Sequence, residues 1–384
     1  MALRRLVVIP ADPLYKYCDK GEIKARYWNP CGLFDEVHIV SLAKRDVEPS
    51  QVQELVGDAK LHIHAVGRPT ALTLVAYYAK VARLIAAIAP DLIRAHGPWH
   101  TGSLAVHAGK KLGIPCLVSV HNDRDAQRSF DGRLLLRLVK PLENYTLRNA
   151  AIVICVSNYL HRYARAHGAQ RTVTVYNKVY MDQFLGERSV DGEGEWPTVL
   201  SVMRLDRQKY PECIVEALKD LPLRLKLIGQ GELEGALKTL VRSLGMEQRV
   251  EFVPMVPNRE IHQHYLQADI FAMATHYEGF CIPVLEAMAA GLPDVAWATE
   301  PIPELLGGTG LVVEKNAAAY AEAFARLAED EALRQRLGTK ARERAQTLAG
   351  DRMEEREAQL YEAVMGQRED ELASLLDDRG RFVE

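Results

Sequence analysis

Two glutamates, Glu278 and Glu286, lie eight positions apart in the stretch HYEGFCIPVLEAMAAGLP. Glu278 stands in a turn beside Gly279, whereas Glu286 stands in an apolar run with the pattern of a buried helix. A buried carboxylate is costly unless hydrogen-bond donors satisfy it. The hydroxyl groups of a bound ligand would do so, and two ribose hydroxyls suit Glu286. The alternative is a pair of ordinary helix glutamates, but the apolar residues 287–290 leave little polar surface near Glu286.

The same stretch predicts an anion site. Pro283 favours a helix that begins near Ile282, because proline is tolerated in the first turn. The backbone N–H groups of Gly279, Phe280 and Cys281 then lie at the positive end of that helix, where a phosphate is favoured.

A second group of charged residues follows the apolar run 198–203. Arg204 and Lys209 are five positions apart, and two cations at that spacing can bind a diphosphate. The alternative is a solvated basic turn. Neither GxGxxG nor GxxxxGK[ST] occurs in the chain, so the common dinucleotide and P-loop motifs are absent.

The elements that must position these residues alternate between strands and amphipathic helices, which predicts parallel βαβ units. The acidic, glycine-rich segment 186–197 interrupts the alternation and predicts a linker. We expect an α/β protein with two tandem Rossmann-like doubly wound domains and a cleft at the carboxyl ends of their strands. The predicted strands are 6–9, 37–40, 61–66, 92–96, 116–120 and 152–157 before the linker, and 198–205, 223–229, 250–256, 270–274 and 294–298 after it.

These motifs resemble a known family. EGFCIPVLEAMAAGLP is similar to the EX7E motif of retaining GT-B glycosyltransferases of the family 4, or "group 1", type, and SVMRLDRQKYPE resembles that family's Gly-Arg-Leu…Lys-Gly segment. The resemblance covers most of the chain. It implies an N-terminal acceptor-binding domain (1–186), a C-terminal donor-binding domain (187–350) and a helical segment (351–384) that packs back on the N-terminal domain.

The resemblance also assigns roles. Arg204 and Lys209 would bind the donor diphosphate and stabilise the leaving nucleotide, Glu286 the ribose, and Glu278 the sugar hydroxyls. Gly279, Phe280 and Cys281 would supply backbone contacts, the base would stack near Phe252 and Val253, and His121 would lie near the donor sugar. Catalysis would then rest on Glu278, His121, Arg204 and Lys209, with no cofactor and no metal.

Three departures from the family pattern concern the substrates. The glycine-rich loop after the first strand is replaced by residues 11–30, and we expect Tyr17, Lys20, Lys24 and Trp28 in it to bind the acceptor. The alternative is a flexible surface loop with a hydrophobic anchor. In addition, Asn177-Lys178-Val179-Tyr180 replaces Asn-Gly-Val-Asp, and Met203 precedes Arg204 in place of glycine.

The implied activity is transfer of a sugar from a nucleotide diphosphate sugar, UDP-linked first and GDP-mannose second. The acceptor would be a glycan or lipid-linked saccharide of bacterial cell-envelope polysaccharide or lipopolysaccharide synthesis. A nucleotide-sugar epimerase or hydrolase, or an inactive sugar-nucleotide-binding subunit, is the alternative. The aromatic loop 11–30 favours a transferase, since an epimerase has no acceptor to bind.

Composition limits the setting. The chain has 384 residues, no apolar run long enough for a membrane helix, and six scattered cysteines, so we expect a cytoplasmic protein. Residues 1–185 carry a net charge of +10 and the remainder −13. The basic amphipathic segment 133–149 would allow association with the inner face of the cytoplasmic membrane, or is an ordinary surface helix. Asp123-Arg124-Asp125 has the DxD form, but its central arginine argues against metal binding.

Overall fold

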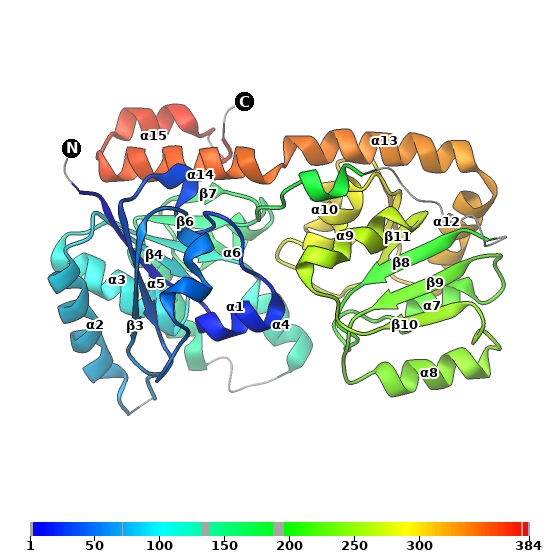
Figure 1. Cartoon of the computed structure of the whole chain (residues 1–384), viewed down its shortest axis with the longest axis horizontal. Helices are drawn as coiled ribbons and strands as arrows, with labels where there is room; N and C mark the ends of the chain where they lie inside the picture. The colour runs from blue at the N-terminus through cyan, green and yellow to red at the C-terminus, as the bar shows by residue number, and fades with distance from the viewer. Residues whose placement is uncertain (1–2, 71, 133–137, 187–195, 378, 383–384) are drawn as a thin grey trace. The chain divides into compact units, whose positions relative to one another are not determined.

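The computed structural model describes residues 3–70, 72–132, 138–186, 196–377 and 379–382. The chain forms two compact domains. The first contains residues 1–178 together with 351–384, and the second contains residues 179–350. Each domain is an α/β unit built on one parallel sheet, so the predicted pair of Rossmann-like domains is confirmed (Figure 1).

The first domain has a seven-stranded sheet in the order β3-β2-β1-β4-β5-β6-β7. Strands β4 and β5 are buried along their whole length, as expected for a parallel sheet covered on both faces. The strands are β1 (Arg5–Ile9), β2 (Glu36–Ser41), β3 (Lys60–Ala65), β4 (Leu92–His96), β5 (Cys116–Val120), β6 (Ile152–Cys155) and β7 (Thr172–Thr174). The helices are α1 (Leu14–Lys20), α2 (Leu74–Ile88), α3 (His100–Leu112), α4 (Arg124–Asp131), α5 (Lys140–Asn149), α6 (Leu160–Ala166), α14 (Gly350–Met365) and α15 (Glu369–Leu375).

Helix α14 belongs to the core of the first domain. Met353, Leu360 and Tyr361 are buried in the same apolar cluster as strand residues of β1 and β2. A buried ion network adds to this packing: Glu357 pairs with Lys178 at 2.8 Å and with Arg94 at 3.3 Å. Lys178, the residue that departs from the family's glycine, therefore has a structural partner on α14.

The second domain has a six-stranded sheet in the order β10-β9-β8-β11-β12-β13. All its strand pairs are parallel. The strands are β8 (Thr198–Val202), β9 (Arg224–Ile228), β10 (Val250–Val253), β11 (Ile270–Met273), β12 (Asp294–Trp297) and β13 (Leu311–Val313). The helices are α7 (Glu212–Leu218), α8 (Glu234–Ser243), α9 (Asn258–Leu266), α10 (Ile282–Ala289), α11 (Ile302–Leu306), α12 (Ala317–Glu329) and α13 (Glu331–Thr347).

The division between the domains differs from the expected boundary at residue 186. It falls after Lys178, because the segment that follows packs on the second domain. Phe184 is fully buried, and its ring lies 5.7 Å from that of Tyr265 on α9. The acidic composition of the linker therefore placed the predicted boundary eight residues too late.

Candidate active site

The residues expected to bind the donor follow two adjacent strands of the second domain. From β8 the chain builds the sheet outwards through β9 and β10, and then crosses to the other side of β8 with β11. Ligands of open α/β sheets bind at the carboxyl ends of the strands where the order reverses in this way. Residues 203–209 follow β8 and residues 274–281 follow β11, so both segments lie at that point.

Lys209 and Glu278 form the centre of this region. The Lys209 ammonium donates a short hydrogen bond to Glu278 Oε1, which also accepts one from Thr275 Oγ1 at 2.9 Å. Both side chains are largely buried, with 11% and 12% exposure. Burial opposes the charge of Lys209, but the Glu278 carboxylate outweighs it and raises the lysine pKa. Lys209 and Glu278 were predicted from the sequence as site residues, whereas Thr275 was not.

Gln208 forms hydrogen bonds between the two segments. Its side-chain amide donates to the main-chain carbonyl of Tyr277 at 2.8 Å, and its main-chain carbonyl accepts from the His276 N–H at 2.9 Å. Arg204 donates to Gln208 Oε1 at 2.8 Å and pairs with Asp206 at 3.2 Å, while its side chain stays 66% exposed. The guanidinium is therefore oriented by its neighbours and still accessible to an anion.

Glu286 has a partner that the sequence did not reveal. The Tyr265 hydroxyl donates to Glu286 Oε2 at 2.8 Å, from α9 to α10. Tyr265 is fully buried, and burial and the nearby carboxylate raise its pKa well above the usual value. The tyrosine stays protonated at neutral pH and fixes one carboxylate oxygen. Tyr265 lies in an amphipathic helix at a position typical of a core residue. The sequence therefore gave no indication that it contacts Glu286.

The turn before α10 has the expected form. The helix begins at Ile282 with Pro283 in its first turn, and Cys281 before it has a left-handed conformation with φ 78°. Phe280 and Cys281 are buried. Burial raises the pKa of the Cys281 thiol, which therefore remains protonated and unsuited to nucleophilic attack. Gly279 lies in the preceding turn.

The residues expected near the base lie farther along the sheet. Phe252 and Val253 end β10, which is two strands away from β8. The Lys238 ammonium lies 5.5 Å from the centre of the Phe252 ring, within cation–π range. The face of this ring is therefore in contact with α8.

In the first domain, His121 follows β5 as predicted. Its Nε2 lies 3.0 Å from Ser119 Oγ and 3.4 Å from His96 Nδ1. Burial and the positive charge of Arg94 lower the His121 pKa to about 4. The ring is thus neutral at pH 7 and suited to hydrogen bonding, not to charge stabilisation.

The predicted acceptor loop 11–30 requires a correction. Trp28 is only 2% exposed and belongs to the core of the first domain, with Tyr17 packed edge-on against it at 5.4 Å. The Trp28 ring is therefore unavailable for stacking on a sugar. Lys24 donates to the carbonyl of Lys178 at 3.1 Å, whereas Lys20 lies at the exposed end of α1. The loop forms a helix and a hydrophobic anchor in place of a flexible surface segment.

The DxD-like acids are engaged elsewhere. Asp123 caps α4 by accepting from the N–H groups of Asp125 and Ala126. The Asp125 carboxylate pairs with Arg128 at 2.6 Å and His167 at 2.8 Å. Of the basic segment 133–149, residues 133–137 lie outside the described residues, and α5 covers most of the rest. No described helix is both long enough and apolar enough to cross a bilayer.

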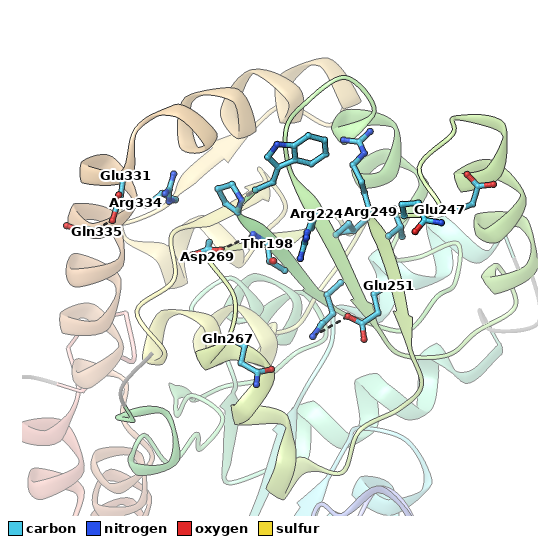
Figure 2. Close-up of a pocket in the computed structure, with 16 residues that line it drawn as sticks. Thr198, Arg224, Glu247, Arg249, Glu251, Gln267, Asp269, Glu331, Arg334 and Gln335 are labelled. Atoms are coloured by element: carbon cyan, nitrogen blue, oxygen red, sulfur yellow. Dashed lines mark hydrogen bonds and ion pairs between the residues drawn. The ribbon is translucent and has the colours of Figure 1, made fainter. Parts of the chain in front are cut away.

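A cavity of about 860 Å³ in the second domain lies away from this region (Figure 2). It is lined by Thr198, Arg224 and Val250, which begin β8, β9 and β10, so it opens at the amino ends of the strands. Two of its cations already have partners: Arg249 donates to main-chain carbonyls at 2.5 and 2.7 Å, and Lys226 pairs with Glu251 at 3.3 Å. We therefore place the candidate site at the opposite edge of the sheet.

Comparison with known proteins agrees with this fold. The family model "Glycosyl transferases group 1" matches residues 187–344, and "Glycosyl transferase 4-like domain" matches residues 25–178. An uncharacterised glycosyltransferase of Methanocaldococcus jannaschii is 26% identical over 66% of this chain and 70% of its own length. A GDP-mannose-dependent α-(1-6)-phosphatidylinositol monomannoside mannosyltransferase of Mycolicibacterium smegmatis is 31% identical over 43% of this chain and half of its own length.

Solved structures show the same architecture. Anabaena HepE, solved in complex with UDP, superposes with a TM-score of 0.77 at 18% identity, covering 94% of this chain and all of that one. The two family models together span most of the chain, one on each domain. The chain therefore belongs to the group 1 glycosyltransferases and is a glycosyltransferase of the GT-B type.

Proposed function

We propose that the chain is a retaining transferase that moves a sugar from a nucleotide diphosphate sugar to a glycan or lipid-linked saccharide. The observation that carries the proposal is the Lys209–Glu278 pair at the strand-order reversal, with Arg204 exposed in the same segment. Lys209 and Arg204 would bind a diphosphate, and the adjacent Glu278 carboxylate can accept hydrogen bonds from sugar hydroxyls.

Each group has a separable part in this reaction. An ammonium has three N–H donors, so Lys209 can keep one on Glu278 and give the others to phosphate oxygens. Arg204 adds a fork of donors for the same anion. Glu286, with one oxygen fixed by Tyr265, offers the other to the ribose hydroxyls. The remaining expected contacts are those of Gly279, Phe280 and Cys281 with the donor, Phe252 and Val253 with its base, and His121 with its sugar.

The proposed chemical step is a displacement on one face of the sugar. The bond from the sugar's anomeric carbon to the phosphate oxygen breaks, and the acceptor oxygen forms its bond on the same face. The acceptor proton passes to the departing phosphate oxygen. Arg204 and Lys209 stabilise the charge that develops on the diphosphate, so catalysis rests on positioning and electrostatics. The step requires no metal, and we expect EDTA to leave the transfer rate unchanged.

UDP is our first choice of donor nucleotide and GDP the second. A structural neighbour was solved with UDP, and one sequence relative is named as GDP-mannose-dependent and acts on a lipid. The name of the GDP-mannose-dependent relative also supports a lipid-linked acceptor. Such an acceptor fits a role in cell-envelope polysaccharide synthesis at the cytoplasmic face of the membrane. For the acceptor contacts we retain Tyr17, Lys20 and Lys24, and exclude the buried Trp28.

Thermal unfolding with UDP, GDP, ADP, CMP and dTDP tests the donor site. A ligand at 100 times its dissociation constant adds about 2.7 kcal/mol of stability, which raises the melting temperature visibly. We expect one nucleotide to stabilise the protein, and Arg204→Ala and Glu286→Ala to abolish the effect. Arg207→Ala is the matched control, because Arg207 is an exposed arginine of the same turn. Equal shifts in Arg204→Ala and Arg207→Ala would contradict the site.

A second measurement separates the transferase from the alternatives. Glu278→Ala should lose turnover with donor and acceptor while it retains nucleotide binding. An epimerase or hydrolase would instead convert the donor without any acceptor, and a binding subunit would show no turnover in the unaltered protein.

A further inference from the structure

Three histidines and a glutamate gather on the outer strands of the first domain's sheet. The register of β2 and β3 pairs His38 with His62 and Val40 with His64. Side chains alternate along a strand, so Glu36 and His38 share one face with His62 and His64. This face is opposite to the one that carries Val37, Ile39 and Leu61 into the apolar core. The group is therefore separate from the second-domain residues discussed above.

The imidazole rings are stacked face to face. The His38 ring lies 4.4 Å from that of His62 with an angle of 9°, and 5.3 Å from that of His64 with an angle of 10°. His38 Nδ1 lies 3.1 Å from His64 Nε2, within hydrogen-bonding distance. When His38 donates this hydrogen bond from Nδ1, its Nε2 carries a lone pair toward the other side.

That Nε2 atom has no hydrogen-bond partner among the described residues, although His38 is only 8% exposed. Glu36 Oε2 lies 3.7 Å from it, which is too long for a hydrogen bond. Buried polar atoms are normally satisfied, so an unsatisfied imidazole nitrogen close to a carboxylate is a candidate pair of cation ligands.

We propose that Glu36, His38 and His62 bind a divalent transition-metal ion, zinc in the first place, with His64 orienting His38. One ligand atom from each of the three lies within 4.8 Å of the others, and these are the only such residues found in the described part of the chain. Two imidazoles and a carboxylate form a typical zinc ligand set, which leaves a fourth position for water. The His38–His64 contact is the kind of outer-shell hydrogen bond that fixes the tautomer of a metal-binding histidine.

The geometry requires a small adjustment. Ligand atoms at ~2.1 Å from a tetrahedral ion lie about 3.4 Å from one another. Glu36 and His62 are half-buried, so the adjustment falls to their side chains, and the Glu36 carboxylate would have to shift away from Arg5.

Two cations flank the same carboxylate. Arg5 Nε lies 2.9 Å from Glu36 Oε2, and Lys60 Nζ lies 3.9 Å from Oε1. They hold the carboxylate in place and compete with a bound ion, so the site should release its metal to chelators. Because one ligand comes from the edge strand β3 and two from β2, the ion would fasten that edge and act in stability, not in sugar transfer.

The test uses the full chain, purified without a histidine tag and stripped with EDTA. We expect calorimetric titration with Zn²⁺ to show one equivalent bound and the melting temperature to rise, with no effect of Mg²⁺. His62→Ala and Glu36→Gln should each weaken zinc binding at least tenfold. His107→Ala is the control, a half-buried histidine of α3 outside the cluster. Co²⁺ should give the strong visible absorption of a tetrahedral site, lost in His62→Ala.

The outcome is independent of the donor site. Circular dichroism and the melting temperature of the metal-free variants check that they fold. Zinc binding that is absent from the unaltered chain, or equally strong in His62→Ala and His107→Ala, would overturn the proposal. The histidines would then be a stacked structural cluster only.

Discussion

Lys209 donates a hydrogen bond to Glu278 across 69 positions of sequence. The contact joins the segments that follow β8 and β11, two strands that lie side by side in the second sheet. Each residue supplies the opposite charge that allows the other to be buried. The same pair is the centre of the proposed diphosphate and sugar contacts, so its two members should fail in different ways when replaced.

Lys209→Met should reduce both turnover and nucleotide binding, because it removes a cation from the diphosphate. Glu278→Gln should retain most nucleotide binding while it lowers kcat by about 100-fold, the usual loss for one transition-state contact. Steady-state kinetics and thermal shifts with UDP and GDP distinguish the two. Lys219→Met, at an exposed lysine of the same domain, is the control. A full nucleotide shift in Lys209→Met would refute its role.

Tyr265→Phe should raise the KM for the donor about tenfold with little change in kcat. The hydroxyl fixes one oxygen of Glu286, and a hydrogen bond to a charged group contributes about 1.5–3 kcal/mol. Tyr320→Phe is a suitable control, since Tyr320 is an equally buried tyrosine whose hydroxyl donates to the Met273 carbonyl instead. An unchanged donor KM in Tyr265→Phe would show that Glu286 does not need this partner.

Asp294→Val should stabilise the protein. Asp294 is fully buried at the start of β12, and neither carboxylate oxygen has a hydrogen-bond partner among the described residues. Burial raises its pKa well above the usual value. A carboxyl group whose folded pKa is raised favours the folded state only at low pH, and this contribution is lost as pH rises above the unfolded value.

The stabilisation by Asp294→Val should therefore be largest at neutral and alkaline pH and smaller near pH 4. Urea unfolding at several pH values measures it. Asp294→Asn, which keeps the buried polar atoms, should gain less. A variant that is less stable than the unaltered protein at pH 7 would mean that Asp294 has a role that the structure does not show.

Glu357→Gln should destabilise the first domain by about 3–5 kcal/mol, because it leaves the buried charges of Lys178 and Arg94 uncompensated. Burial opposes ionisation of Glu357, but Lys178 and Arg94 outweigh it and hold its pKa at about 2. A lowered folded pKa contributes stability above the unfolded value of about 4.3, which is lost as pH falls toward 2.

The difference in unfolding free energy between the unaltered chain and Glu357→Gln should thus be constant above about pH 5 and shrink below it. Chemical unfolding from pH 7 to pH 3 measures this difference. Glu355→Gln, at an exposed position of the same helix, should change little. Equal effects of the two substitutions would show that the ion network of Glu357 does not stabilise the packing of α14.

The sequence predicted every longer strand of both sheets, because these strands are short runs of continuous or alternating apolar residues bounded by turn residues. It missed β7 and β13, each of three residues, because such short strands leave no readable pattern. The start of α10 near Ile282 was predicted correctly, since Pro283 has a local preference for the first turn of a helix. Which residues lie beside Glu278 and Glu286 depends on tertiary packing.

Trp28 shows why a composition argument fails. Aromatic and basic residues alternate in segment 11–30, and this pattern fits both a sugar-binding loop and a hydrophobic anchor with a charged surface. In the structure Trp28 is part of a hydrophobic anchor, and it packs beside Tyr17, Tyr27 and His96. Residue types alone do not distinguish a ring that faces solvent from one that faces the core.

The return of α14 to the first domain has a consequence for how the protein is made. The core of that domain includes Leu6 near the start of the chain and Leu360 and Tyr361 near its end. The second domain is continuous and leaves the ribosome whole, so it can fold while the first domain still lacks its last helix. During synthesis the first sheet therefore exposes an apolar face for longer than the second, and that interval is when the chain is most open to aggregation or to chaperones.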